Sequence, residues 1–224
     1  PYFGYARADR KTSGRESITA KLTANLLEKS GVDRVLAMDL HSAQIQGYFD
    51  IPCDHIYGSP VLIDYLETLD LEEIVVVSPD VGGVARARAF AKLMKDAPLA
   101  IIDKRRSAHN IAESLTVIGE VKGKTAILID DMIDTGGTIC SGANLLKKEG
   151  ANRIFACASH AVFSPPSYER LSSKNLFEQV IVTNSIPVIH KDNFPQLKVL
   201  SVANMLGEAI WRIHEESSVS SMFR

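Results

Sequence analysis

The sequence predicts an α/β protein whose parallel sheets are flanked by helices. Two observations predict this class: short apolar runs of strand length recur along the chain, and helical stretches lie between them. The 224 residues are 46% apolar and 23% charged. This composition is typical of a globular chain with a packed core, and the length is enough for one large domain or two small ones.

Six apolar runs are predicted to be strands. They are short, rich in β-branched residues and nearly continuous in hydrophobicity, as expected for strands that are buried on both faces. The runs are Arg34–Leu40, Glu73–Ser78, Leu99–Asp103, Thr125–Ile129, Arg153–Ala158 and Gln179–Thr183.

Helices are predicted between these strands and near the end of the chain. Gly31 and Gly150 follow two of them and suit the left-handed position that ends a helix. The polar, cationic segment Lys104–Ser114 lacks periodicity and is interpreted as a mobile loop. The predicted helices are Glu16–Lys29, Val84–Lys95, Thr138–Glu149 and Val202–Ile213.

Charge and cysteine content limit the possible partners and location. The formal net charge of -2 gives no support for a nucleic-acid partner, and no apolar run is long enough to cross a membrane. Three cysteines far apart in sequence favour reduced thiols in a cytoplasmic compartment. The start lacks the apolar core of a secretory signal and has no initiator Met, which is consistent with a processed or partial chain.

The strongest chemical signal is the segment that follows the predicted strand Thr125–Ile129. Glycines allow backbone N–H groups to approach a phosphate, and a helix N-terminus favours an anion. Carboxylates repel phosphate but accept hydrogen bonds from vicinal sugar hydroxyls. The alternative is a capped turn, and a P-loop is excluded because no G-K-[ST] follows the glycines. The candidate ribose 5-phosphate-binding residues are Asp130, Asp131, Asp134, Thr135, Gly136, Gly137 and Thr138.

This segment resembles the phosphoribosyl diphosphate loop of the type I phosphoribosyltransferase fold. Further motifs narrow the resemblance to the ribose-phosphate diphosphokinase family, also called phosphoribosyl diphosphate synthetases. YARADRK and the tail WRIHEESSVSSMF resemble the cyanobacterial and plastid branch. The motifs are Tyr5–Lys11, Met38–Asp50, Ser78–Arg88 (SPDVGGVARAR), Ile102–Arg106 (IDKRR) and Val182–Ile186 (VTNSI).

The resemblance implies an activity and a domain organisation. The diphosphoryl group of ATP would be transferred to the C1 hydroxyl of ribose 5-phosphate, giving phosphoribosyl diphosphate and AMP, with Mg²⁺ as cofactor. Two type I phosphoribosyltransferase-like domains would be present. An N-terminal-type domain would span 1–58 and 201–224, the other would span 59–200, and the active site would lie between them.

The resemblance also assigns side chains to ATP and metal. Arg7, Asp9 and His41 would bind ATP, and His41, Asp39 and Asp80 would lie near Mg²⁺. Asp39 and His41 alternate at the end of a predicted strand, so both are expected to face one way. Without the family, His41 is equally well interpreted as a hydrogen-bonded histidine, and Asp80 as a helix cap.

Lys104 and Arg106 follow the predicted strand Leu99–Asp103, and the resemblance makes them the catalytic cations. In phosphoryl transfer, cations neutralise the charge that grows on the transferring and leaving oxygens. Without the family, the segment is a solvated basic loop.

Family members begin upstream of Pro1, so we expect this chain to lack the first strands of its N-terminal domain. The full-length form would be a homo-oligomer of dimers that assemble to a hexamer, located in the cytoplasm, or in the plastid stroma of a plant. Two alternatives remain open: a non-catalytic regulatory homologue or inactive fragment, and a phosphoribosyltransferase of the same fold.

Overall fold

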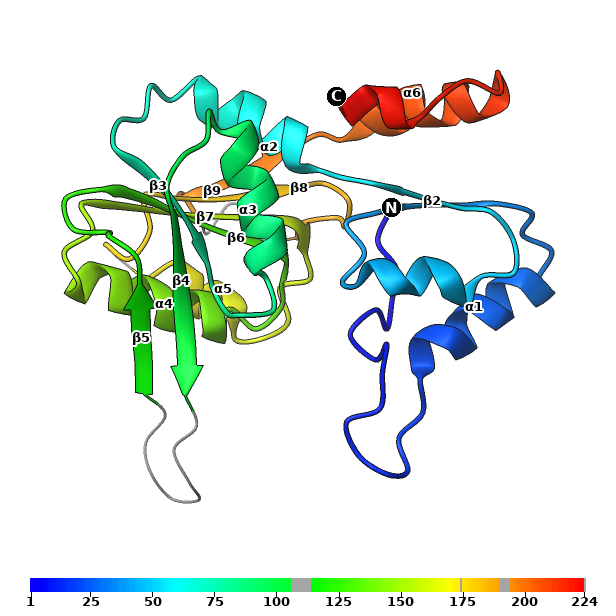
Figure 1. Cartoon of the computed structure of the whole chain (residues 1–224), viewed down its shortest axis with the longest axis horizontal. Helices are drawn as coiled ribbons and strands as arrows, with labels where there is room; N and C mark the ends of the chain where they lie inside the picture. The colour runs from blue at the N-terminus through cyan, green and yellow to red at the C-terminus, as the bar shows by residue number, and fades with distance from the viewer. Residues whose placement is uncertain (106–113, 174, 190–193, 224) are drawn as a thin grey trace. The chain divides into compact units, whose positions relative to one another are not determined.

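The computed structural model describes residues 1–105, 114–173, 175–189 and 194–223. The chain divides into two compact units (Figure 1). Unit 1 comprises Pro1–Pro60 and Ser201–Arg224, and unit 2 comprises Val61–Leu200. The interpretation of these units as an N-terminal-type domain and a phosphoribosyltransferase-like domain stays a prediction.

Unit 2 is built on a seven-stranded sheet in the order β5-β4-β3-β6-β7-β8-β9. All neighbouring strands are parallel except β4 and β5, which are antiparallel. The sheet therefore confirms the predicted α/β class with mainly parallel strands. The strands are β3 (Ile74–Ser78), β4 (Leu99–Arg105), β5 (Ser114–Ile118), β6 (Thr125–Ile133), β7 (Arg153–Ala161), β8 (Gln179–Thr183) and β9 (Leu197–Leu200).

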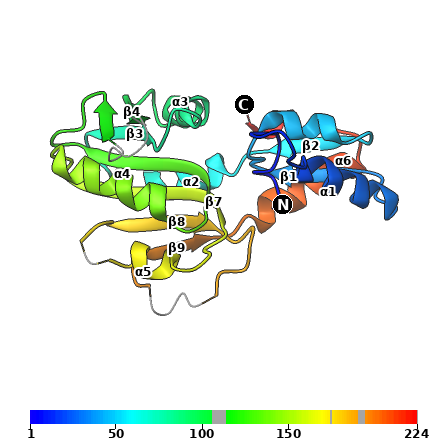
Figure 2. The same ribbon diagram turned by 90° about the horizontal axis from the view of Figure 1, so that it is seen from below.

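Helices cover both faces of this sheet because its central strands are apolar on both sides. Along β6, Ala126 and Leu128 pack in one buried cluster, while Ile127 and Ile129 pack in the other. The first cluster includes residues of α4 and α5, and the second includes residues of α2 and α3, on opposite faces of the sheet (Figures 1 and 2). The helices are α2 (Ser59–Glu67), α3 (Val84–Leu93), α4 (Gly137–Lys148) and α5 (Ser167–Leu171).

The strand order reverses between β3 and β6. From β3 the chain passes through α3 to β4, and from β6 it passes through α4 to β7 on the other side. Because α3 and α4 cover opposite faces, the loops that follow β3 and β6 separate at the carboxyl edge of the sheet. Ligands of open α/β sheets bind at such a switch point.

Unit 1 has a smaller core around a two-stranded parallel sheet of β1 and β2. Phe3 and Phe49 meet edge to face with ring centroids 5.6 Å apart, and Ala20 and Ala24 of α1 are fully buried. Small residues on α1 let the helix pack closely against this core. The elements are α1 (Thr19–Lys29), β1 (Val35–Met38), β2 (Cys53–Ile56), α6 (Ala203–His214) and the 3₁₀ segments Ala43–Tyr48 and Ser220–Phe223.

Several local predictions differ from the structure. The predicted loop at Lys104–Ser114 is wrong at its ends, because Lys104 lies in β4 and Ser114 begins β5; residues 106–113 lie outside the described part. Tertiary pairing extends these strands beyond what the polar sequence indicates. No pattern in the sequence analysis predicted β2, β5, β9, α2 or α5. Within the described residues, no helix is long and apolar enough to cross a membrane.

Candidate functional site

The segment from Asp130 to Thr138, here called the Asp130 loop, joins the carboxyl end of β6 to α4. Asp131 is buried and Asp130 is partly exposed, whereas Thr135 and Thr138 are exposed. The first turn of α4 contains no acidic residue. The polar groups that sequence analysis selected thus meet at the positive end of the α4 dipole, where an anion is stabilised.

Two glycines make the tight turn of the Asp130 loop possible. Gly136 has a left-handed backbone with φ of 73°. A Cβ atom on Gly136 would lie 3.3 Å from Leu171 Cγ of α5. A Cβ atom on Gly137 would lie 3.4 Å from a guanidinium nitrogen of Arg170, whose Nη1 donates a 3.1 Å hydrogen bond to the Thr135 carbonyl. Side chains at either glycine would crowd the turn.

The two adjacent carboxylates at the start of the Asp130 loop share one cation. Arg86 Nη1 lies 3.1 Å from Asp130 Oδ1 and 3.3 Å from Asp131 Oδ1. The Asp131 backbone N–H donates a 2.9 Å hydrogen bond to Asp130 Oδ1. Burial, followed by hydrogen bonding to Asp131 and its charge, raises the pKa of Asp130, and the Arg86 guanidinium opposes that rise.

The Asp80–Gly83 segment, here called the Asp80 loop, joins β3 to α3. Asp80 Oδ1 accepts a 2.8 Å hydrogen bond from the Gly83 N–H, and the Ser78 hydroxyl donates to the Asp80 carbonyl at 2.6 Å. Asp80 therefore closes the turn that precedes α3, whose N-cap is Gly83 and not Asp80 as the alternative interpretation had it, and its side chain remains exposed. A hydrogen bond to one oxygen of the Asp80 carboxylate is compatible with a metal contact by the other oxygen.

The predicted ATP and metal residues of unit 1 lie in non-repetitive backbone. Arg7 and His41 are exposed, Asp9 is partly exposed, and its carbonyl accepts a hydrogen bond from the Tyr48 hydroxyl. Asp39 is only 9% exposed, and its Oδ2 accepts a 2.8 Å hydrogen bond from the Gly58 N–H.

The predicted alternation of Asp39 and His41 along one strand is wrong. Strand β1 ends at Met38, and Asp39 takes a φ of 41°, so the chain leaves the extended conformation before His41. Its bond to the N–H of Gly58 gives Asp39 a structural role, because it ties the end of β1 to the segment that follows β2.

The structure describes only one of the two predicted catalytic cations. Lys104 is exposed in β4, where its register partner is Leu115 of β5. Arg106 lies outside the described residues.

Comparisons with known proteins agree with the motifs. Residues 105–224 match a family described as the phosphoribosyl synthetase-associated domain, and residues 1–31 match the N-terminal domain of ribose phosphate pyrophosphokinase. A ribose-phosphate pyrophosphokinase of Prochlorococcus marinus subsp. pastoris is 96% identical over 224 residues, which is 100% of this chain and 68% of the relative. The chain belongs to the ribose-phosphate pyrophosphokinase family.

Two further relatives support this membership. Ribose-phosphate pyrophosphokinase 1 of Spinacia oleracea is 66% identical over 226 residues, covering 100% of this chain and 67% of its own length. The crystal structure of phosphoribosylpyrophosphate synthetase from Mycobacterium smegmatis superimposes with a TM-score of 0.89 at 45% identity, over 97% of this chain and 70% of that one. The predicted resemblance is thus confirmed, with cyanobacterial and plant relatives.

A pyrophosphokinase needs to bind the charged phosphates of its substrate, and a preformed metal cage is one way to do so. Among the described residues, no three His, Cys, Asp or Glu side chains converge in a way that could hold a metal ion. Mg²⁺ is commonly held by one or two carboxylates together with substrate phosphates, so a lone exposed carboxylate such as Asp80 fits that donor pattern.

Arg86 lies within the motif Ser78–Arg88, but the sequence analysis assigned it no role. A local signal existed, because Arg86 is the third residue of α3, where the helix dipole disfavours a cation. What compensates for this unfavourable position is the contact with Asp130 and Asp131, which depends on the pairing of β3 with β6.

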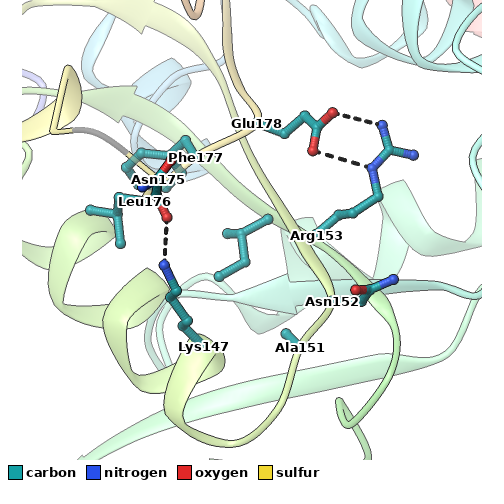
Figure 3. A pocket seen from close by; sticks show the side chains of 9 residues that line it. Lys147, Ala151, Asn152, Arg153, Asn175, Leu176, Phe177 and Glu178 are labelled. Carbon is teal, nitrogen blue, oxygen red and sulfur yellow. Dashed lines mark hydrogen bonds and ion pairs between the residues drawn. The ribbon is translucent and has the colours of Figure 1, made fainter.

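A hollow of about 220 Å³ lies elsewhere in unit 2, at the amino ends of β7 and β8 (Figure 3). Its cations are already engaged: Lys147 donates to the Asn175 carbonyl at 2.7 Å, and Arg153 pairs with Glu178 at 3.0 Å. Because the strands are parallel, this hollow opens at the edge opposite to the Asp130 loop. We assign it no catalytic role.

Proposed function

We propose that this chain carries the activity of its family. It transfers the diphosphoryl group of ATP to the C1 hydroxyl of ribose 5-phosphate and releases AMP. The observation that carries the proposal is the Asp130 loop of a confirmed family member, which combines a carboxylate pair with a glycine-lined helix N-terminus.

The carboxylate end of the Asp130 loop binds the sugar. Asp130, Asp131 and Asp134 are acceptors, and vicinal hydroxyl groups are matching donors. Hydrogen bonds to ionised acceptors are about twice as strong as neutral ones, so they hold the ribose in one orientation. Such positioning is a main contribution of proteins to phosphoryl transfer.

The glycine end of the same loop binds the 5-phosphate. The backbone N–H groups of Gly136, Gly137 and Thr138 lie at the start of α4 and are donors for the phosphate. The hydroxyl groups of Thr135 and Thr138 add further donors. The exposure of both threonines keeps these hydroxyls accessible to a ligand. The Asp130 loop therefore binds both the phosphate and the vicinal hydroxyl groups of the same ribose 5-phosphate molecule.

Arg7, Asp9 and His41 bind ATP in this proposal, and Asp39, His41 and Asp80 are the candidates to contact Mg²⁺. The exposed side chain of Asp80 supports its assignment better than the buried carboxylate of Asp39, which already accepts a bond from Gly58. Bound Mg²⁺ would neutralise charge on the phosphates of ATP.

Lys104 and Arg106 stabilise the transition state. As the C1 oxygen bonds to the β-phosphorus, the bond from that phosphorus to the oxygen bridging to the α-phosphorus breaks. AMP leaves with the bridging oxygen, and the hydroxyl proton is released to solvent. Negative charge grows on the leaving oxygen and the transferring group, and cations placed there lower the barrier.

The remaining assignments rest on the family resemblance. The full-length protein is proposed to be a homo-oligomer of dimers that assemble to a hexamer. The alternatives of a regulatory homologue and a phosphoribosyltransferase are not favoured, because the relatives reported above are named as pyrophosphokinases or as a phosphoribosylpyrophosphate synthetase.

A product assay tests the proposal. Purified protein is incubated with ATP, ribose 5-phosphate and Mg²⁺, and the nucleotide products are separated. We expect AMP and phosphoribosyl diphosphate in equal amounts, and no reaction when Mg²⁺ is chelated. ADP as the product would indicate an ordinary kinase and would contradict diphosphoryl transfer.

A further inference from the structure

Arg86 joins two segments that are 44 residues apart in sequence. It lies in the first turn of α3, directly after the Asp80 loop, and reaches the carboxylates at the end of β6. Pairing of β3 with β6, from Ile74 opposite Thr125 to Val77 opposite Leu128, brings the two strand ends side by side. The contact is therefore built by the central strands of the sheet.

The contact is half-enclosed and its geometry is specific. Side-chain exposure is 27% for Arg86, 23% for Asp130 and 2% for Asp131, so water screens the three charges only in part. One guanidinium nitrogen touches an oxygen of each carboxylate. Asp130 Oδ1 also accepts the Asp131 N–H, which fixes the orientation of that carboxyl group.

Two neighbouring carboxylates in such a place resist being ionised together. Repulsion and burial favour keeping a proton on one of them, and a protonated carboxyl group accepts fewer hydrogen bonds from a diol. A cation shared by both opposes this tendency. Removing the Arg86 cation would leave two carboxylates without a compensating positive charge. Breaking a buried ion pair by removing one partner in this way is strongly destabilising.

We propose that Arg86 is a positioning residue that orients the Asp130–Asp131 pair and favours its ionised form, and thereby sets the affinity for the vicinal hydroxyl groups of the sugar. The inference rests on the proposed function, because it takes the Asp130 loop as the ribose 5-phosphate site. Arg86 acts on the diol end of that loop only. It is not assigned to the phosphate end or to ATP.

The test compares two sugars by calorimetry on the complete chain. Arg86→Gln is expected to weaken ribose 5-phosphate binding about tenfold or more. The loss should be several-fold smaller for 2-deoxyribose 5-phosphate, which offers one hydroxyl fewer. Arg86→Lys should recover part of the affinity, because it keeps the charge but loses the planar fork. Lys92→Gln removes an exposed cation of the same helix and should change neither affinity.

A pH series adds a readout that misfolding alone would not produce. The charged groups that meet here are Arg86, Asp130 and Asp131. In Arg86→Gln the rise of sugar affinity with pH should occur at higher pH than in the unaltered chain, because without the cation the pair keeps its shared proton longer. Equal losses for both sugars at every pH would overturn the proposal in favour of a purely structural role.

The outcomes also separate this inference from the proposed function. If the unaltered chain does not bind ribose 5-phosphate, the proposed function itself is overturned. If the unaltered chain binds it and Arg86→Gln binds it equally well, only the role of Arg86 is overturned.

Discussion

The Asp80 loop and the Asp130 loop follow neighbouring parallel strands and both enter a helix through paired glycines, but they use their acidic side chains differently. Asp80 accepts a hydrogen bond from the N–H of Gly83 in its own loop. Asp130 and Asp131 instead contact a cation from the helix that follows the other loop. The Asp80 carboxylate stabilises the turn of its own loop, while the Asp130–Asp131 pair depends on the neighbouring helix.

The difference indicates how one fold motif serves two purposes. In the Asp80 loop, the Gly83 N–H is already bonded to the Asp80 carboxylate, so this loop offers one N–H group fewer to a ligand. In the Asp130 loop, the turn is made by Gly136 in a left-handed conformation, so capping by a side chain is not needed for the turn. We infer that the Asp130 loop is the ligand loop and that the Asp80 loop supports it.

The largest effect on turnover should come from outside both loops. Lys104→Ala is expected to lower kcat by about 10²–10³-fold while changing either KM little, because its charge acts in the transition state. Steady-state AMP release measures both parameters, with Lys92→Ala as the matched surface control. A loss found only in KM would show that Lys104 binds ground-state phosphate.

The next largest effect is on ribose 5-phosphate affinity, and it compares an acidic residue of the Asp130 loop with one of the Asp80 loop. Asp134→Asn is expected to weaken ribose 5-phosphate binding by about 1.5–3 kcal/mol, the value of a charged hydrogen bond. Asp80→Asn should change the affinity measured without Mg²⁺ by less than about 0.5 kcal/mol. Calorimetry with both variants gives the comparison. Equal losses would mean that both loops bind the sugar.

Substituting a glycine of the Asp130 loop should destabilise the protein more than substituting a glycine of the Asp80 loop. Gly136→Ala is expected to lower the free energy of unfolding by about 1–3 kcal/mol, because φ is 73° and the new Cβ meets Leu171 at 3.3 Å. Gly82→Ala should cost less, since its new Cβ meets only a side-chain oxygen of Asp80 at 3.3 Å. Denaturant unfolding measures both. A smaller cost at Gly136 would contradict the proposed turn strain.

The smallest effect concerns pH. The pKa of Asp130 is raised in the folded state, so the unfolded chain loses this proton more readily than the folded chain. The free energy of unfolding therefore falls as pH rises above the ordinary pKa of 3.8. Asp130→Asn cannot ionise, and its melting temperature relative to the unaltered chain should increase from pH 5 to pH 8. We expect a change of about 2–4 °C, equivalent to about 1 kcal/mol. A difference that stays constant with pH would contradict this linkage.

Local patterns in the sequence predicted much of the site. The continuous apolar run of β6 predicted a strand buried on both faces, and the glycines predicted the turn into α4. Both are confirmed by the burial of β6 and the bounds of α4. These features depend on side-chain periodicity and backbone freedom within a few residues, which the sequence displays directly.

Other features failed because their causes are not local. Strands β4 and β5 pair antiparallel at the sheet edge, and this pairing carries both strands into the polar segment at Lys104 and Ser114 that was interpreted as a loop. Asp39 leaves the strand conformation with a φ of 41°, where its carboxylate bonds to Gly58 nineteen positions later in the chain. Pairing with a distant segment supplied the stabilisation in both cases.

By itself, the sequence determined the α/β class, the Asp130 loop and the family. Only the tertiary structure decided that β3 and β6 are neighbours and that Arg86 of α3 holds the Asp130–Asp131 pair. The physical reason is that strand order comes from the packing of two helical layers on one sheet. Contacts over 44 residues have no periodic signature along the chain.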